Sequence, residues 1–247
     1  MNNDTVLITG GTGAIGVALC ARFHADGYTV VANCHPSDGE RSEVALAALR
    51  EAGVHAELAP FDVTDPDACA AAATDIESRI GPIGALVNAA GITRDATLAK
   101  LEPDAWRAVL STNLDGVYNV SRPVVAAMSE RGYGRIVNIS SVNGQRGQIG
   151  QTNYSAAKAG MTGFTRALAR EVARDGITVN SVSPGYVRSP MIEAIPEAVQ
   201  AKVVKQIPVG RFAEPDEIAR VVAFLCHRES AYITGSDVSV NGGFHIG

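Results

Sequence analysis

Short apolar runs rich in valine, isoleucine and leucine alternate with longer, alanine-rich amphipathic segments along the whole chain. This alternation is typical of βαβ units around a parallel sheet with helices on both faces. The apolar runs predict seven strands, at residues 5–9, 29–34, 55–61, 85–88, 135–140, 178–183 and 237–240. The amphipathic segments predict helices at residues 14–26, 41–51, 66–80, 103–130, 154–175 and 215–227.

The chain shows no internal boundary. No linker, low-complexity stretch or repeat separates two halves, so we expect a single domain over residues 1–247. One stretch near residues 185–210 is irregular and long for a plain connection. We therefore expect a mobile substrate lid at about residues 186–210.

The composition argues against nucleic-acid and membrane partners. Hydrophobic residues make up 46% of the chain, which is ample for a sheet covered on both faces. Aromatic residues make up only 5%, which leaves little material for stacking on bases, and a net charge of -5 provides no general basic field. The start has no basic region followed by a long apolar stretch, and no later run could span a bilayer, so we expect a cytoplasmic protein.

The cysteines do not form a recognisable metal or redox motif. The four of them are scattered, without a C-x-x-C pair and without a histidine at metal-ligand spacing. We expect reduced, structural thiols and no metal site. The four are Cys20, Cys34, Cys69 and Cys226.

A glycine-rich turn follows the first predicted strand. Residues 9–16 read TGGTGAIG and lead into a predicted amphipathic helix. Glycines at this place permit a tight turn and let backbone N–H groups approach a pyrophosphate at the helix N-terminus. A nucleotide-triphosphate loop is excluded because Val17 and Ala18 follow Gly16, where lysine and serine or threonine would be needed. The turn therefore predicts dinucleotide binding, although such glycines can also serve only strand-to-helix packing.

The end of the second strand indicates which nicotinamide cofactor is used. An acid there would bond the ribose 2′-hydroxyl of NAD and repel the 2′-phosphate of NADP. This chain has Asn33-Cys34-His35 instead, with no acid before Asp38 and with Arg41 a few residues on. We predict NADPH as cofactor and Arg41 as a phosphate partner, the alternative being that Arg41 only decorates a solvated helix.

A tyrosine and a lysine lie four residues apart on a predicted helix. Tyr154 and Lys158 therefore share one face of that helix. A free phenol titrates near pH ~10, and a nearby ammonium favours the phenolate. The pair predicts a tyrosine that exchanges a proton near working pH.

Two further polar residues complete a candidate catalytic set. Ser141 ends an apolar strand thirteen positions before Tyr154, at the sheet edge where ligands collect in open α/β folds, and its hydroxyl could polarise a carbonyl. Ser140 is adjacent, and only the spacing selects Ser141. Asn113 lies within a predicted long helix although asparagine is a poor helix former, which points to a polar role holding Lys158 or a water, the alternative being a satisfied core asparagine.

Taken together, these motifs resemble the short-chain dehydrogenase/reductase superfamily from Thr9 to the C-terminus. The resemblance implies one doubly wound Rossmann domain with a seven-stranded parallel sheet in the order 3-2-1-4-5-6-7, flanked by helices. It implies a catalytic tetrad of Asn113, Ser141, Tyr154 and Lys158. The cofactor site that it implies consists of Gly10, Gly13, Ile15, Gly16, Arg41, Asp62, Val63, Asn88, Ala89, Gly91, Tyr154, Lys158, Pro184, Gly185 and Val187. The turn at Ala14 departs slightly from the family, which more often has glycine there.

Within the superfamily, residues 91–95, 135–145 and 150–154 resemble reductases of 3-oxoacyl thioesters, in particular those that act on acetoacetyl-CoA in polyhydroxyalkanoate synthesis. The likeness favours a CoA thioester over an acyl-carrier-protein thioester but supplies no physical discriminator. It implies a homotetramer that contacts through the helices at 103–130 and 154–175. The substrate contacts that we expect are Asp95, Gln148, Gln151 and Tyr186, and Arg188 is a candidate for meeting pantetheine phosphates.

The resemblance also implies roles in the reaction. Tyr154 would protonate the carbonyl oxygen that Ser141 holds, Lys158 would bond the nicotinamide ribose and lower the tyrosine pKa, and Asn113 would fix a relaying water. Two other classes stay open: a regulator that binds NADPH without turnover, and a secondary-alcohol or sugar dehydrogenase. The intact tetrad argues against the regulator, because a sensor has no need for a proton-donating pair.

Overall fold

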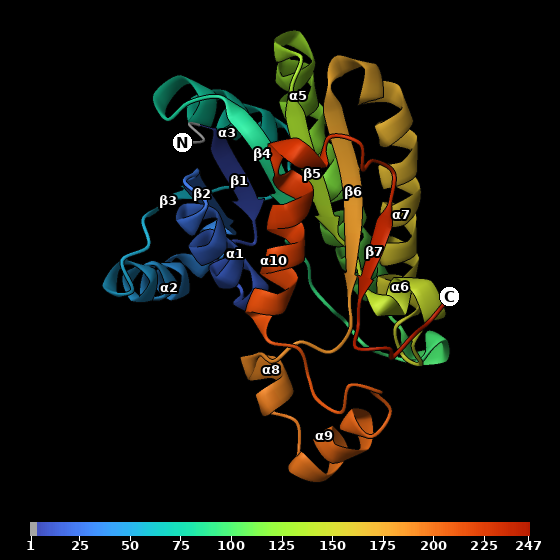
Figure 1. The fold of residues 1–247 in the computed structure, drawn as a ribbon. Helices are drawn as coiled ribbons and strands as arrows, with labels where there is room; N and C mark the ends of the chain where they lie inside the picture. The colour runs from blue at the N-terminus through green and yellow to red at the C-terminus, as the bar shows by residue number, and fades with distance from the viewer. Residues whose placement is uncertain (1–3) are drawn as a thin grey trace.

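A computed structural model describes residues 4–247 and contains a seven-stranded parallel sheet in the order β3-β2-β1-β4-β5-β6-β7 (Figure 1). The predicted fold class and strand order are confirmed. Residues 1–3, with which the expected domain begins, lie outside the described residues. The strands are β1 (Thr5–Thr9), β2 (Thr29–Cys34), β3 (Ala56–Pro60), β4 (Ile83–Asn88), β5 (Gly134–Ile139), β6 (Ile177–Pro184) and β7 (Asp237–Val240).

Helices cover both faces of the sheet. They are α1 (Ala14–Ala25), α2 (Gly39–Glu51), α3 (Pro66–Arg79), α4 (Pro103–Leu110), α5 (Gly116–Arg131), α6 (Val142–Arg146), α7 (Thr152–Val172), α8 (Pro190–Glu193), α9 (Glu197–Val204) and α10 (Pro215–Cys226). In Figure 1, α1 and α10 lie in front of the sheet, and α5 and α7 lie behind it or at its side. Alternate strand residues point to opposite faces, so each strand contributes to two separate cores.

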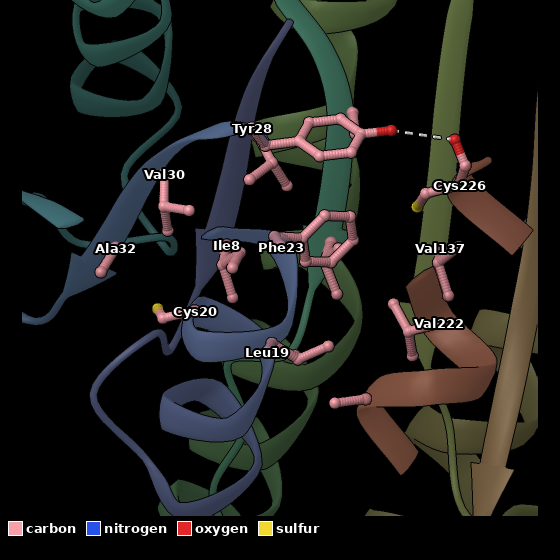
Figure 2. Packing of buried hydrophobic residues seen from close by; sticks show 14 of the residues in the cluster. Ile8, Leu19, Cys20, Phe23, Tyr28, Val30, Ala32, Val137, Val222 and Cys226 are labelled. Carbon is pink, nitrogen blue, oxygen red and sulfur yellow. Dashed lines mark hydrogen bonds between the residues drawn. The ribbon is translucent and has the colours of Figure 1, made fainter. Parts of the chain in front are cut away.

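The first core lies between the sheet, α1 and α10. Figure 2 shows Phe23 of α1 and Tyr28 of the following turn at its centre, with their rings edge to face and their centroids 5.1 Å apart. The buried Tyr28 hydroxyl donates to the Cys226 carbonyl at 3.2 Å, so the polar tip of this aromatic residue has a partner. The contact ties the end of α10 to the start of β2.

The second core lies on the opposite face, beneath α3, α5 and α7. Leu7, Leu86 and Ile136 of neighbouring strands are buried there against Val124 and Met128 of α5. All four cysteines are buried and free, as expected of structural thiols. Together the two cores fix the sheet, and with it the carboxyl ends of the strands, where the arrowheads in Figure 1 point.

Most predicted boundaries lie within two residues of the observed ones when the 3₁₀ turn η4 (Ala173–Asp175) is counted with α7. The helix predicted at 103–130 is an exception, because a π-helical turn, η3 (Ser111–Asp115), separates α4 from α5. The prediction of one regular helix was therefore wrong at its centre. Because π turns are frequently found at functional sites, this break draws attention to its central residue, Asn113.

Three short helices escaped the sequence pattern. The five-residue α6 is preceded by its N-cap, Ser141, whose hydroxyl accepts the Asn143 N–H at 3.1 Å. Helices α8 and α9 lie in the predicted irregular stretch and project beyond the carboxyl edge of the sheet (Figure 1). Such segments are too short for a 3.6-residue period to be recognised.

Backbone hydrogen bonds join the two ends of this projecting segment at its base. The Arg188 N–H donates to the Ala213 carbonyl at 2.8 Å, and the Ala213 N–H donates to the Tyr186 carbonyl at 2.9 Å. Val187 and Ala213 also form an isolated parallel bridge.

No helix within the described part of the chain is long and apolar enough to cross a membrane.

Candidate active site

The glycine-rich turn between β1 and α1 has no room for side chains at Gly10, Gly11 and Gly16, and a Cβ on Gly11 would lie 2.7 Å from Ala32 Cβ. Gly10 has φ +63°, and a Cβ built there would lie 2.9 Å from Ala90 Cα. A Cβ on Gly16 would overlap the Gly10 carbonyl oxygen, which lies directly against the first turn of α1. Gly13, in contrast, meets only the Gly10 oxygen, at 3.3 Å, so its outer side is open. The turn thus combines close internal packing with an accessible backbone at Gly13.

The N-terminus of α1 is electrostatically suited to an anion. Its N-cap residue, Gly13, supplies no side-chain hydrogen bond, and its first turn contains no acidic residue. By comparison, α3 is capped by Asp65, whose carboxylate accepts the N–H groups of Asp67 and Ala68. The uncapped positive end of α1 and the open side of Gly13 fit the pyrophosphate of a dinucleotide.

The end of β2 braces the glycine turn. Asn33 is buried, accepts the Gly10 N–H at 3.3 Å and donates to the Phe61 carbonyl at 2.9 Å. Its side chain therefore joins β1, β2 and the end of β3. At the beginning of α2, the Ser42 hydroxyl lies 3.2 Å from the Thr12 hydroxyl. The exposed Arg41 precedes Ser42 and so lies close in the chain to this contact with the glycine turn.

Asp62 follows β3 at the same edge of the sheet. Its carboxylate accepts the Thr64 N–H and hydroxyl, both at 2.8 Å, and lies 3.4 Å from His35 Nε2. Partial burial works to raise the Asp62 pKa, but the Thr64 hydrogen bonds and His35 outweigh it, so this pKa is lowered. Val63 packs against Gly116, where a Cβ would lie 2.9 Å from the valine side chain.

Hydrogen bonds to the buried side chains of Thr9 and Asn88 fix the turn after β4 and the strand before it. The N–H groups of Ala89 and Ala90 donate to the Thr9 hydroxyl at 3.0 and 3.1 Å. The buried Asn88 amide donates to Asn138 of β5 at 2.8 Å. Thr9 and Asn88 therefore fix the ends of three neighbouring strands, which are the floor of the site.

Ser141, Tyr154 and Lys158 come together at the carboxyl end of β5. The Ser141 hydroxyl lies beside the Tyr154 phenol, close enough to work to lower its pKa. Lys158 is buried, with its Nζ 5.6 Å from the centroid of the Tyr154 ring, and it donates to the Ile139 carbonyl at 2.7 Å. The helical spacing of tyrosine and lysine thus brings both to the strand that ends at the serine.

The adjacent serine has a different environment. The Ser140 hydroxyl donates to the Lys158 carbonyl at 3.0 Å, so it joins β5 to α7. Ser141 instead faces Tyr154. The geometry therefore separates the two serines that the sequence left distinguishable only by spacing.

Asn113 lies next to this group, at the π turn. Its carboxamide pairs with the backbone of Ile92, accepting the N–H at 2.8 Å and donating to the carbonyl at 2.9 Å. A Cβ on Gly91 would lie 3.3 Å from Asn113 Oδ1 and 3.7 Å from Lys158 Nζ. The asparagine oxygen and the lysine ammonium therefore border the same small space beside Gly91.

Burial controls the protonation of the pair. It is the largest influence on Tyr154, whose pKa it raises above the ordinary value; the hydrogen bond with Ser141 works to lower this pKa, and the Asp95 carboxylate works to raise it. Burial also lowers the pKa of Lys158 from 10.5 to about 8. In this arrangement Tyr154 retains its proton at neutral pH, and the expected lowering of its pKa by Lys158 is not seen.

Asp95 and Gln151 form a connected polar pair beside Tyr154. Gln151 Nε2 donates to Asp95 Oδ2 at 2.9 Å, and Gln151 Oε1 accepts from Asn143 Nδ2 at 2.9 Å. Asn153 anchors the same region, because it donates to the Arg94 carbonyl at 3.0 Å and accepts the Tyr154 N–H at 2.8 Å. Sequence reasoning missed Asn143 and Asn153, and their positions beside Ser141 and Tyr154 were the signal available.

The other expected substrate residues are more widely spread. Gln148 is partly exposed in the loop between α6 and α7. Tyr186 lies at the base of the projecting segment, where its ring contacts Phe244 with centroids 5.4 Å apart. Arg188 forms an ion pair with Glu214 at 2.9 Å, so its charge already has a partner.

Three expected cofactor contacts lie at the end of β6 or just after it, and one, Ile15, belongs to α1. Pro184 ends β6, and a Cβ on Gly185 would lie 2.9 Å from Asn241 Cα, so the chain turns tightly against the end of β7. Val187 is partly buried and packs on the first core, as does Ile15. The structure therefore places these residues at the sheet edge that carries Ser141.

Known proteins resemble the chain over almost its full length. The family model described as enoyl-(acyl carrier protein) reductase matches residues 11–245. An acetoacetyl-CoA reductase of Allochromatium vinosum is 52% identical over 97% of this chain and 98% of its own length. One of Cupriavidus necator is 47% identical over 100% of both chains. A 3-oxoacyl-[acyl-carrier-protein] reductase of Pseudomonas aeruginosa is 40% identical over 100% of this chain and 99% of its own.

Proposed function

The chain belongs to the short-chain dehydrogenase/reductase family of oxidoreductases, which bind a nicotinamide cofactor. On that basis we propose that it catalyses the NADPH-dependent reduction of a 3-oxoacyl thioester to the 3-hydroxyacyl thioester, with acetoacetyl-CoA as the favoured substrate. The observation that carries the proposal is the placement of Ser141 and of the buried Lys158 beside Tyr154.

Ser141 orients the ketone in this reaction. Its oxygen accepts the Asn143 N–H at 3.1 Å, which leaves the hydroxyl hydrogen free to donate. A donor fixed in this way at the carbonyl oxygen stabilises the negative charge that develops there in the transition state. NADPH supplies the hydride to the keto carbon when it is bound.

Tyr154 donates the proton to the same oxygen. Its raised pKa supports this direction, because a proton donor must begin protonated. Lys158, with a pKa of about 8, is mostly an ammonium ion at neutral pH, and its charge stabilises the phenolate left after proton transfer. The space that Asn113 and Lys158 border at Gly91 is where we place the relaying water.

The substrate assignment is tested by initial rates of NADPH consumption at equal concentrations of acetoacetyl-CoA, an acetoacetyl-acyl-carrier protein and a simple ketone. We expect acetoacetyl-CoA to be reduced fastest. A faster rate with the carrier protein would favour the sister reductases, and a rate with simple ketones alone would indicate a secondary-alcohol dehydrogenase. NADPH binding without turnover of any substrate would identify the sensing regulator.

NADPH preference rests on the absence of an acid at the end of β2 and on Arg41. Neither Asn33 nor His35 carries a carboxylate that could bond a ribose 2′-hydroxyl. The Asn33 amide is used inside the glycine turn, and His35 lies near Asp62. Arg41 is exposed next to Ser42, which contacts the glycine turn. It is the cation that we assign to the 2′-phosphate.

Replacing Arg41 with alanine should raise the KM for NADPH roughly 10- to 100-fold, because a charge-assisted hydrogen bond contributes about 1.5–3 kcal/mol. The KM for NADH should not change, since NADH lacks the phosphate. Steady-state kinetics with both cofactors measures the difference. Arg50→Ala, at the exposed end of α2, is the matched control. Equal losses with both cofactors would assign Arg41 to helix stability instead.

Assembly and location belong to the proposal as well. We propose a cytoplasmic homotetramer in which copies of the chain meet through α4, α5 and α7. Gly160 of α7 is explained within one chain, because a Cβ there would lie 3.1 Å from Leu114 Cδ2. Gly163 has no atom within 4 Å of such a Cβ, which leaves room for a close helix partner. We propose likewise that residues 186–210 act as a lid, with Tyr186 and Ala213 as its fixed base.

A further inference from the structure

Helix α6 connects the candidate active site to the edge of the sheet. Its N-cap is Ser141, and a Cβ on Gly144 would lie 2.9 Å from the Cβ and carbonyl carbon of Lys158. The helix therefore packs directly against α7 at the lysine. Figure 1 shows α6 beside the lower ends of α7 and β7. A movement of α6 would change the position of Ser141 relative to Lys158.

Gln145 links α6 to β7 through its side chain. Its Nε2 donates to Asp237 Oδ2 and to the Ser239 hydroxyl, both at 2.9 Å. A carboxylate can only accept hydrogen bonds, so Asp237 dictates that the amide nitrogen of Gln145 faces the strand. Gln145 Oε1 is buried without a partner among the described residues, which agrees with an orientation set by Asp237.

Two serines of the neighbouring strand β6 hold the Asp237 carboxylate in place. Its Oδ1 accepts the hydroxyls of Ser181 and Ser183 of β6 at 2.9 and 2.8 Å, and both serines are fully buried. Ser181 is also the register partner of Asp237 in the β6–β7 ladder. The carboxylate is therefore fixed by two strands and presents its other oxygen to Gln145.

A helix of five residues needs such an anchor. One or two helical turns are unstable alone, because nucleation is unfavourable and few backbone hydrogen bonds form. Arg146 is the last residue of α6, and its guanidinium lies 4.3 Å from the centre of the Phe244 ring in the C-terminal segment. Gln145 provides two hydrogen bonds that join α6 to β7 of the sheet.

We propose that Asp237 is a positioning residue for the reaction: through Gln145 it fixes α6, and so holds the Ser141 hydroxyl toward Tyr154. The inference rests on the proposed function, because it takes Ser141 as the group that orients the ketone. Asp237 does not touch the substrate. It acts on the rate through the placement of a donor, and small displacements of such groups reduce rates strongly.

The main test exchanges the amide of Gln145 and the carboxylate of Asp237 between the two positions. Gln145→Glu places two carboxylates at a distance of one hydrogen bond and should lower kcat roughly 10- to 100-fold. Asp237→Asn added to that variant should restore kcat to within about threefold of wild type. In the double variant, the amide introduced at position 237 can donate to the new carboxylate while its oxygen still accepts from Ser181 and Ser183. Asp75→Asn, on an exposed ion pair of α3, is the matched control for loss of a carboxylate.

A second variant separates positioning from folding. Gln145→Met keeps the length of the side chain, removes both hydrogen bonds and adds no charge, and it should lower kcat roughly tenfold with NADPH affinity unchanged. In a Ser141→Ala background the same change should cost less than about twofold, because the group that it displaces is already absent. An equal loss in both backgrounds would overturn the proposal.

Hydrogen exchange of α6 gives a readout that needs no substrate. Amides of residues 142–147 should exchange roughly tenfold faster in Gln145→Glu than in wild type, and the added Asp237→Asn should reverse the change. Unchanged exchange, or failure of the double variant to restore both exchange and kcat, would overturn the proposal. A wild-type protein that reduces no 3-oxoacyl thioester would instead contradict the proposed function, while the exchange rates would still decide whether Asp237 anchors α6.

Discussion

Tyr154→Phe is expected to lower kcat for acetoacetyl-CoA by roughly 10²- to 10⁴-fold, the usual contribution of a positioned general acid. The change removes one oxygen from a half-buried ring and keeps the packing of α7. Ser141 would keep its hydrogen bond from the Asn143 N–H, so the ketone would still be oriented. The transition state would lose only its proton donor.

Binding should separate from turnover in this variant. The phenol hydroxyl contributes little to the glycine turn or to the Arg41 region, so the Kd for NADPH, measured by fluorescence titration, should stay within about threefold of wild type. Tyr232→Phe, at a fully exposed tyrosine, is the control and should leave both quantities unchanged. Turnover close to wild type in Tyr154→Phe would refute the assignment of the proton donor.

The fold could be predicted because its determinants are local. Each strand is a short apolar run, and each long helix carries an apolar stripe, so the number and order of elements follow from the pattern of the chain. The strand order itself came from the family resemblance. The sequence could not predict the π turn at Asn113, because nothing local distinguishes it from a regular helix. The asparagine amide at its centre pairs with Ile92, 21 positions away, and such a contact cannot be read from the local pattern.

The site was predictable to the extent that it depends on helix geometry and strand ends. The four-residue spacing of Tyr154 and Lys158 required only a helix, and the placement of Ser141 required only a strand that ends there. The connection from Asp95 to Gln151 joins residues 56 positions apart and cannot be read from local pattern. The same holds for the contact of Gln145 with Asp237, which are 92 positions apart.

Protonation was the property least accessible from the sequence. A nearby lysine favours the phenolate, and this led to the expectation of a lowered tyrosine pKa. Burial acts in the opposite direction and has the larger effect in the structure, raising the pKa of Tyr154. Burial depends on the tertiary packing around α7, which no spacing within that helix reveals.

Lys158→Met should abolish most activity and yet stabilise the protein at neutral pH. Turnover should fall roughly 10²- to 10³-fold, because the phenolate left by proton transfer would lose its neighbouring charge. Methionine fills nearly the same volume without a charge to bury. The free-energy cost of burying the Lys158 ammonium is reflected in its pKa, which burial lowers from 10.5 to about 8.

The sign and the pH window of the stability effect follow from that pKa. A lysine whose pKa is lower in the folded than in the unfolded protein destabilises the fold fully below pH about 8, where both states carry the charge. The destabilisation disappears as the pH rises from about 8 to 10.5, because the folded state loses its proton first. The lowered pKa corresponds to about 3 kcal/mol over this window. Lost hydrogen bonding to the Ile139 carbonyl offsets part of the gain at every pH and leaves the pH dependence unchanged.

Urea unfolding of Lys158→Met and wild type between pH 7 and 10.5 tests this directly. The free energy of unfolding of the variant relative to wild type should fall by about 3 kcal/mol across the range, from its highest value at pH 7. Lys202→Met, at an exposed lysine of α9, should show no such trend. A difference that stays constant with pH would mean that Lys158 keeps an ordinary pKa in the folded protein. The tyrosine would then work beside a fully charged ammonium throughout the neutral and mildly alkaline range, and the pH dependence of turnover would have to arise from another group.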